Sequence, residues 1–286
     1  MSSGNIRYGA TIRKRYMAVK KEKTTLYKCG SCGKTKVINL ASSLNKPELI
    51  VNGKRIDGRD FNELRPLKIE AGVLKNADGS AYEEWGDNKV LVAVYGPKEA
   101  PRYLADPNKA VIKAKYSMAS FSGLNGHGRS NPSRREIEIS KVTSDVFSNV
   151  VDLAQFPGSE IDIDIEILQS DGGTRAAGIT AASVALANAG IPMKDLVYAV
   201  SAARIEDKVS IDVNMIEDNY SDADIPFAIS PRNNDVLLLQ FDGGVTREQM
   251  KEAENMVIEA GKTISKIQKD ALKKSYEEVS KQYEEK

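Results

Sequence analysis

The segment Gly172-Gly173-Thr174-Arg175 has the residue types of an anion-binding site. It opens an alanine-rich stretch that predicts a helix over Thr174–Ala189, and a helix N-terminus presents unpaired N–H groups and about half a positive charge. Two glycines let an anion approach the backbone, while Thr174 adds a hydroxyl donor and Arg175 a forked cation. We therefore predict that Gly173, Thr174 and Arg175 bind phosphate. A plain strand-to-helix turn with a surface arginine is the alternative.

Two further segments carry charges that suit a phosphodiester. Arg134 and Arg135 lie about forty residues before the anion segment and could grip two successive phosphates. About forty residues after it, Asp218 and Asp224 belong to a stretch with four acids in eight residues, which we predict to be a loop. Two carboxylates suit a Mg²⁺ ion that keeps its waters, or an acid that protonates a leaving 3′ oxygen. Surface salt bridges and a solvated acidic loop are the alternatives.

Charge is divided unevenly along the chain. The 286 residues have a net charge of +1, but residues 1–40 hold ten Lys or Arg and one acid, a charge of +9. The remaining residues hold 31 bases and 39 acids, a charge of −8. A basic arm on an acidic body predicts that the arm meets nucleic acid. A solvated tail is the alternative.

The sequence has few metal-binding and redox residues. Cys29 and Cys32 are its only cysteines and His127 is its only histidine, so half of the four ligands of a closed zinc site are missing. No apolar run reaches the eighteen or so residues of a membrane span, and the first residues lack the apolar stretch of a signal peptide. We expect a cytoplasmic protein without a membrane partner.

Hydrophobic periodicity predicts antiparallel strands with helices between them, which is an α+β fold. Ser133 with Glu136 three residues later is the capping-box pattern of a helix start. A long helix is predicted from about Thr246 to Tyr283. The predicted strands cover Leu67–Val73, Ser80–Trp85, Lys89–Tyr95, Val111–Met118, Glu160–Leu168, Val197–Arg204, Val209–Asn214, Ile225–Ile229 and Val236–Phe241. We divide the chain into a basic extension (1–40), a linker (41–55) and one domain (56–286).

Ordered motifs over about three quarters of the chain resemble the RNase PH family, in particular the catalytic ring subunits of archaeal exosomes. They include the anion segment, the paired arginines and the Asp218…Asp224 pair. Further matching motifs are Arg55-Ile56-Asp57-Gly58-Arg59, Glu63-Leu64-Arg65-Pro66-Leu67, Asn76-Ala77-Asp78-Gly79-Ser80, Val94-Tyr95-Gly96-Pro97-Lys98-Glu99 and Ala189-Gly190-Ile191-Pro192. The resemblance implies an α+β RNase PH domain with mixed or antiparallel sheets, packed helices and a long C-terminal helix.

The resemblance also implies a 3′→5′ exoribonuclease that uses inorganic phosphate as co-substrate, releases nucleoside diphosphates and can add RNA tails in reverse. Arg102, Arg134 and Arg135 would bind RNA, while Asp218 and Asp224 would supply acid and metal functions, with Mg²⁺ as the metal. The implied partners are RNA, a homologous inactive subunit in a hexamer of three heterodimers, and RNA-binding cap subunits. A homohexameric tRNA-trimming RNase PH and a non-catalytic RNA-binding ring or ribosome-associated subunit are the alternatives.

The basic extension carries a second resemblance. Residues from about 5 to 38, including Cys29-Gly30-Ser31-Cys32, are similar to the front half of a zinc-ribbon protein of the large ribosomal subunit. The second cysteine pair of that family is absent, so Cys29 and Cys32 form an incomplete zinc site. Zinc bound here would need ligands from elsewhere.

Overall fold

The computed structural model describes residues 25–28, 35–38, 47–123 and 132–284. The chain divides into two compact units, Met1–Glu48 and Leu49–Lys286. In the first unit, β1 (Thr25–Lys28) pairs antiparallel with β2 (Thr35–Ile38). Cys29, Cys32 and His127 lie outside the described residues, so the incomplete zinc site at the two cysteines stays a prediction.

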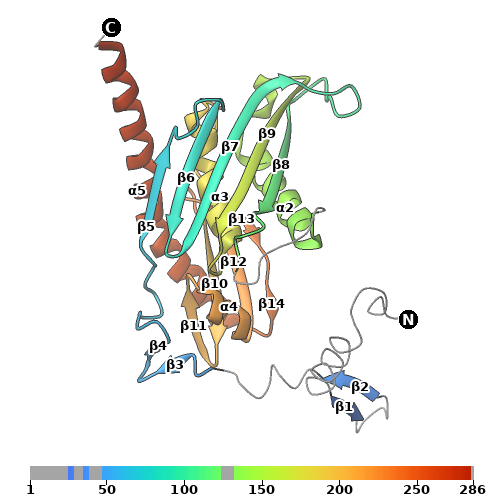
Figure 1. Cartoon of the computed structure of the whole chain (residues 1–286), viewed down its shortest axis with the longest axis vertical. Coiled ribbons are helices and arrows are strands. Elements are labelled where there is room, and N and C mark those ends of the chain that lie inside the picture. The colour runs from blue at the N-terminus through green and yellow to red at the C-terminus, as the bar shows by residue number, and fades with distance from the viewer. Residues whose placement is uncertain (1–24, 29–34, 39–46, 124–131, 285–286) are drawn as a thin grey trace, which may run out of the picture. The chain divides into compact units, whose positions relative to one another are not determined.

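The second unit begins with a small hairpin and a large mixed sheet (Figure 1). The hairpin pairs β3 (Ile50–Val51) with β4 (Lys54–Arg55), within the predicted linker. The sheet has the order β5-β6-β7-β9-β8 and is antiparallel except where β8 runs parallel to β9. Its strands are β5 (Leu67–Ala71), β6 (Gly79–Trp85), β7 (Asn88–Glu99), β8 (Val111–Met118) and β9 (Ser159–Gln169).

Strand β9 anchors the core of this sheet. Its alternating residues Ile161, Ile163, Ile165 and Ile167 are all buried, as their period-two spacing predicts. The acidic residues between them face the other side of the sheet, where Lys98 pairs with Asp162. Alternation thus fixes which face of the sheet receives the helices.

A second sheet holds the later part of the chain. Its order is β11-β10-β12-β13, with β14 beside β12. The strands are β10 (Tyr198–Ile205), β11 (Lys208–Ile211), β12 (Ala223–Ser230), β13 (Asp235–Leu239) and β14 (Asp242–Gly243). A short helix, α4 (Met215–Tyr220), connects β11 to β12. This helix stands where we predicted an acidic loop. Its start is a capping box, in which the Asn214 side chain accepts from the first turn and the Glu217 carboxylate accepts from the backbone N–H of Asn214.

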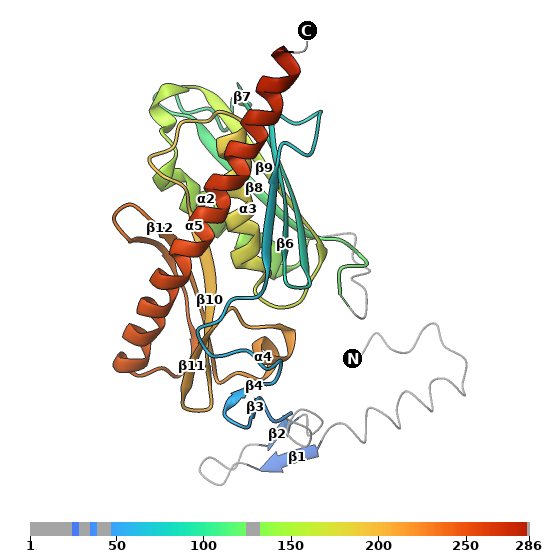
Figure 2. The same ribbon diagram turned by 90° about the vertical axis from the view of Figure 1, so that its left-hand side faces the viewer.

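Three longer helices pack on the two sheets (Figure 2). The first, α2 (Arg134–Val150), starts at the predicted Ser133–Glu136 capping box and lies against β8. The alanine-rich α3 (Thr174–Asn188) is almost wholly buried and contacts β6 and β7 of one sheet and β10 of the other. The last, α5 (Arg247–Glu284), runs along β5 and β10. Among the helices in the described part of the chain, none combines the length and hydropathy of a bilayer span.

Candidate active site

The N-terminus of α3 is built for close approach to its backbone. Gly172 and Gly173 have φ angles of 69° and 67°, a left-handed conformation that glycine adopts readily. A Cβ at Gly172 would lie 2.5 Å from the carbonyl carbon of Asn214, so a larger residue does not fit. Gly173 is the N-cap residue, and no side chain bonds to the first turn. The first N–H groups of α3 are therefore suited to bind an anion.

Thr174 and Tyr116 form a buried hydroxyl pair beside this turn. The Tyr116 hydroxyl donates to Thr174 Oγ1 at 2.8 Å, and both side chains are buried. Burial raises the pKa of Tyr116, so its hydroxyl stays protonated at neutral pH. Because Thr174 accepts this bond, its own hydrogen is left to donate elsewhere. Tyr116, which the sequence analysis did not single out, thus orients Thr174 as a donor.

Arg175 is held by two residues that the sequence analysis also missed. Its guanidinium donates to Gln240 Oε1 and lies 3.3 Å from Glu138 Oε1. The Gln240 side-chain amide in turn donates to the same Glu138 oxygen at 3.1 Å. The Arg175 side chain is only 17% exposed, so these contacts fix its fork in one orientation. No spacing in the sequence signals this clamp, because Gln240 lies 65 residues beyond Arg175.

Asp218 and Asp224 lie close to each other and to the arginines. Asp218 is in α4, and Asp224 is on β12, opposite Ala203 of β10. Burial raises the pKa of both carboxyl groups, and with the charge of Asp218 it brings that of Asp224 to about 6. Arg135 and Arg175 oppose this shift at both aspartates. The structure therefore brings Arg135, Arg175 and the two carboxylates into one electrostatic cluster.

A buried ionic network holds this cluster in place. Arg55 donates through Nε to Glu217 Oε1 at 2.8 Å and through Nη1 to the carbonyl of Ile211 at 2.8 Å. The side chains of Arg55 and Glu217 are fully buried. Glu217 is thus a structural ion-pair partner that fixes α4, although the sequence analysis grouped it with the other acids of its segment.

Arg65 and Asp212 extend the network to the glycine turn. Arg65 Nη2 lies 2.7 Å from Asp212 Oδ1, and Arg65 Nη1 donates to the carbonyl of Asp171 at 2.5 Å. Asp212 Oδ2 also accepts from Trp85 Nε1 at 3.0 Å. Because Asp171 precedes the two glycines, Arg65 sets the position of the turn that opens α3.

Two predicted RNA contacts lie outside the cluster. Arg134 is exposed at the first turn of α2. Unlike Arg135, it is not among the charges that lower the pKa of Asp218 and Asp224. Arg102 lies in the exposed connection from β7 to β8. The start of β7 contacts the glycine turn, through Asn88 and the Gly172 carbonyl. The twelve residues of β7 therefore put Arg102 roughly 35 Å away, at the far end of the sheet (Figure 1).

Comparison with known proteins agrees with this architecture. A profile of the 3′ exoribonuclease family matches its domain 1 to residues 63–192 and its domain 2 to residues 195–260. A protein of Thermoplasma volcanium named Exosome complex component Rrp41 is 54% identical over 223 residues, or 78% of this chain and 90% of the relative. The chain belongs to the RNase PH family of 3′ exoribonucleases.

Other RNase PH relatives extend the likeness. The Exosome complex component Rrp41 of Thermococcus kodakarensis is 52% identical over 82% of this chain and 94% of its own. Among solved structures, rice Rrp46 aligns with a TM-score of 0.70 and 26% identity, covering 77% of this chain and 100% of its own. A chain of the Archaeoglobus fulgidus exosome with RNA bound to the active site gives a TM-score of 0.66 and 25% identity, covering 75% and 92%.

These findings confirm the predicted family, the α+β fold class and the activity class, a phosphorolytic 3′→5′ exoribonuclease. The second resemblance is confirmed as well, because a profile of the Ribosomal L37ae protein family matches residues 5–46. An RNase PH domain therefore shares one chain with a segment that is similar to a ribosomal protein.

The aspartate pair fits the chemistry of a magnesium site. Within the described residues there is no group of three or more His, Cys, Asp or Glu side chains that could hold a metal ion. Mg²⁺, however, commonly takes one or two carboxylates, with waters and substrate phosphates as its other ligands. Asp218 and Asp224 supply such a pair, and a cation between them would relieve the repulsion that raises the pKa of Asp224.

Proposed function

We propose that this chain is the catalytic ring subunit of an exosome-type complex and that the cluster at the N-terminus of α3 is its phosphorolytic centre. One observation supports this placement above the others. Arg135 and Arg175 both act on the pKa of Asp218 and Asp224, beside a helix N-terminus that no side chain caps. Phosphate, RNA and proton donor would therefore meet at one point.

Inorganic phosphate would bind at the start of α3. The backbone N–H groups, the Thr174 hydroxyl and the Arg175 guanidinium would supply the hydrogen-bond donors. Gln240 and Glu138 bind the Arg175 guanidinium and would keep it in one orientation toward the phosphate. One phosphate oxygen then lies in position to attack the last phosphodiester of an RNA strand.

The reaction forms one phosphorus–oxygen bond and breaks another. The oxygen of inorganic phosphate attacks the phosphorus atom of the terminal nucleotide, and the bond from that phosphorus to the preceding 3′ oxygen breaks. A proton passes to the leaving 3′ oxygen. The products are a nucleoside diphosphate and an RNA strand one nucleotide shorter. The reverse reaction adds a nucleotide to the strand and releases phosphate.

Asp218 and Asp224 would supply the proton and hold Mg²⁺. Without a bound cation, the pKa of Asp224 is about 6, so this carboxyl group keeps its proton more readily than an ordinary aspartate, which suits a general acid. Bound Mg²⁺ would neutralise charge on the reacting phosphate groups. Arg135 would grip the terminal phosphodiester, Arg134 a neighbouring phosphate, and Arg102 a more distant part of the strand.

Assembly is a second element of the proposal. Relatives named Exosome complex component support membership of such a complex. Within it, we propose a ring in which this chain alternates with a homologous inactive subunit, as three heterodimers, under RNA-binding cap subunits. A homohexameric tRNA-trimming RNase PH is the rival arrangement. Purified alone, the rival would form a complete active hexamer, whereas the proposed subunit would need its partner for full activity. The cytoplasmic location stays a prediction from the sequence.

The extension of residues 1–40 is proposed to bind RNA through its charge of +9. Deleting it should weaken RNA binding and flatten the dependence of that binding on salt, because fewer counterions are released. Turnover at saturating RNA should persist. Zinc at Cys29 and Cys32 would require ligands from a second molecule.

An RNA decay assay with product identification tests the chemistry. Decay should require inorganic phosphate and yield nucleoside diphosphates. Arg175→Ala should lower the rate by roughly 10²–10³, the usual loss when a donor to a reacting anion is removed. Lys141→Ala, an exposed change on α2, is the matched control and should leave the rate unchanged. Decay without phosphate, or monophosphate products, would refute phosphorolysis at this site.

A further inference from the structure

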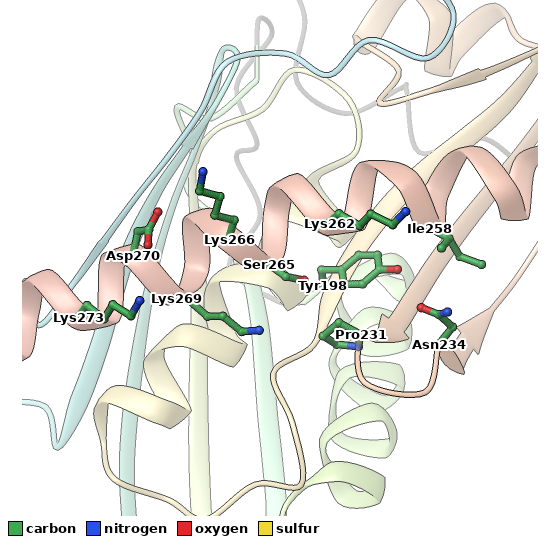
Figure 3. A pocket seen from close by; sticks show the side chains of 11 residues that line it. Tyr198, Pro231, Asn234, Ile258, Lys262, Ser265, Lys266, Lys269, Asp270 and Lys273 are labelled. Atoms are coloured by element: carbon green, nitrogen blue, oxygen red, sulfur yellow. The ribbon is translucent and has the colours of Figure 1, made fainter.

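A second polar site lies where α5 crosses the second sheet (Figure 3). It is a pocket of about 590 Å³ between α5 and the turn that joins β12 to β13. Tyr198, Ser265, Pro231 and Asn234 line it, together with lysines of α5. Its volume is in the range of small-molecule sites. Nothing in the proposed reaction uses it.

Two hydroxyl groups form the floor of this pocket. Tyr198 is 1% exposed and its ring lies directly on Gly261, where a Cβ would come within 2.1 Å of Tyr198 Cζ. Glycine at position 261 thus makes room for the ring against α5. Ser265 is 5% exposed, and its Oγ has no hydrogen-bond partner among the described residues. A buried hydroxyl without a partner is unfavourable, so a ligand that accepts its hydrogen would stabilise the site.

Lysines of α5 line one side of the pocket. Lys262, Lys266, Lys269 and Lys273 line the pocket, against the single acid Asp270. Figure 3 shows that Lys269 lies on the side of α5 that faces Tyr198 and the Pro231–Asn234 turn, whereas Lys266 and Asp270 point away from them. Lys262 pairs with Glu259 at 2.6 Å, and no ion pair is found for Lys269 within the described residues. The side of the pocket nearest the hydroxyls is therefore rich in donors and positive charge.

This pocket is separate from the candidate active site. Tyr198 begins β10 opposite Ile229, whereas Asp224 pairs with Ala203, five residues further along the same strand. That interval corresponds to roughly 17 Å of strand. A ligand on Tyr198 and Lys269 would therefore not occupy the phosphate position at α3.

The donor set defines the ligand class. Burial raises the pKa of Tyr198 to about 12, so its hydroxyl is a donor at every physiological pH. Lysine ammonium groups are donors without acceptor capacity. The Tyr198 ring packs on α5 and offers no exposed face on which a base could stack. The lining therefore suits an anion with several acceptor oxygens rather than a nucleobase.

We propose that the pocket of Tyr198, Ser265, Lys262 and Lys269 binds phosphate groups, carried by the backbone of single-stranded RNA or by a free nucleoside diphosphate. The Ser265 and Tyr198 hydroxyls donate to phosphate oxygens at the floor, and the lysines neutralise the charge at the rim. Such a site holds RNA or nucleotide away from the reacting bond and without sequence preference.

Binding measurements on the full chain test the proposal. RNA affinity is measured in phosphate-free buffer, where phosphorolysis cannot proceed, across a series of salt concentrations. The pocket variant is Lys262→Gln with Lys269→Gln. Its matched control is Lys274→Gln with Lys251→Gln, which removes one lysine paired to Glu278 and one exposed lysine from the same helix outside the pocket. ADP binding is measured by calorimetry on the same proteins.

If RNA is the source of the phosphates, the pocket variant should bind RNA more weakly. Its slope of log affinity against log salt should be shallower than that of the control by roughly 1.4, because each phosphate contact to a single strand contributes roughly 0.7. If the source is free nucleotide, RNA binding should match the control while ADP binding weakens. Ser265→Ala, which changes no charge, should weaken binding of whichever probe the lysine variant binds less well, and should leave the unfolding temperature near that of the wild type.

Two results would overturn the proposal. Equal behaviour of the pocket variant and its control with both probes would mean that only general charge matters. Unchanged binding of both probes, with loss of assembly with a homologous ring subunit in gel filtration, would make the pocket a protein–protein contact instead.

Discussion

Two clusters of charged residues lie next to each other in this protein, and they are built in opposite ways. In the network of Arg55, Arg65, Asp212 and Glu217, each carboxylate accepts several hydrogen bonds from arginines or the backbone. In the cluster of Asp218 and Asp224, burial raises the pKa of both carboxyl groups, and the charge of Asp218 raises that of Asp224 further. We infer that the paired charges hold the fold, whereas the raised pKa values of Asp218 and Asp224 are typical of groups that meet a substrate, a proton or a metal.

The contrast is sharpest between neighbours in the sequence. Glu217 and Asp218 are consecutive residues of α4, yet Glu217 is fully buried against Arg55 while Asp218 faces the active-site arginines. Adjacent residues on a helix point about 100° apart, since there are 3.6 residues per turn. One short helix can therefore anchor itself with one acid and direct the next toward Arg135 and Arg175.

Glu217→Gln should have the largest effect on stability. It leaves the fully buried Arg55 without its counter-charge, and breaking a buried pair from one side typically costs about 3–5 kcal/mol. Urea unfolding of the wild type and the variant measures this loss. The double variant Arg55→Met with Glu217→Met removes both charges and should recover much of the stability. A double variant no better than the single one would show that the charges themselves are needed.

Asp224→Asn should move stability in the opposite direction. The pKa of Asp224 is about 6 in the folded protein, against 3.8 for an ordinary aspartate, so the native state holds its proton over this interval. By linkage, ionisation makes the folded state less stable as pH rises from about 4 to 6, by up to about 3 kcal/mol. Asparagine does not ionise, so the variant should be the more stable protein at pH 7.

The pH dependence is the control for this prediction. Well below pH 3.8, Asp224 is protonated in both the folded and the unfolded protein, and the unfolding temperatures of wild type and Asp224→Asn should converge. Mg²⁺ should raise the unfolding temperature of the wild type more than that of the variant, because the ion needs both carboxylates. A stability difference that does not vary with pH would mean that ionisation of Asp224 is not its cause.

Gln240→Ala should have a smaller effect, confined to catalysis. Arg175 loses one of the two partners that orient it, and a displaced guanidinium binds phosphate less well. We expect KM for inorganic phosphate to rise by roughly tenfold, about the worth of one hydrogen bond to a charged group. KM for RNA should stay within twofold of the wild type. Equal changes in both constants would indicate a general structural role for Gln240.

Much of the fold could be predicted because its signals are local. The isoleucines of β9 recur at every second position and all face the core, and Ser133 with Glu136 marks the start of α2 within four residues. The parallel pairing of β8 with β9 could not be read in the same way, since strand patterns do not state direction. The last helix was predicted closely, because its apolar stripe repeats over many turns.

The candidate site was predictable by residue type but not by partnership. Thr174, Arg175, Asp218 and Asp224 were identified from chemistry and from the family motifs. The roles of Glu217 and Gln240 depend on contacts with residues 162 and 65 positions away, which no local pattern reports. Arg102 was likewise grouped with Arg134 and Arg135 as an RNA contact, because the sequence does not show that the length of β7 separates it from them.

The division of labour between Glu217 and Asp218 is tested most directly by one paired measurement on Asp218→Asn. Its phosphorolysis rate and its unfolding temperature are determined on the same preparation, with wild type beside it. We predict that RNA decay is abolished while the unfolding temperature equals or exceeds that of the wild type. Retained decay, or loss of decay together with a large fall in unfolding temperature, would contradict the account.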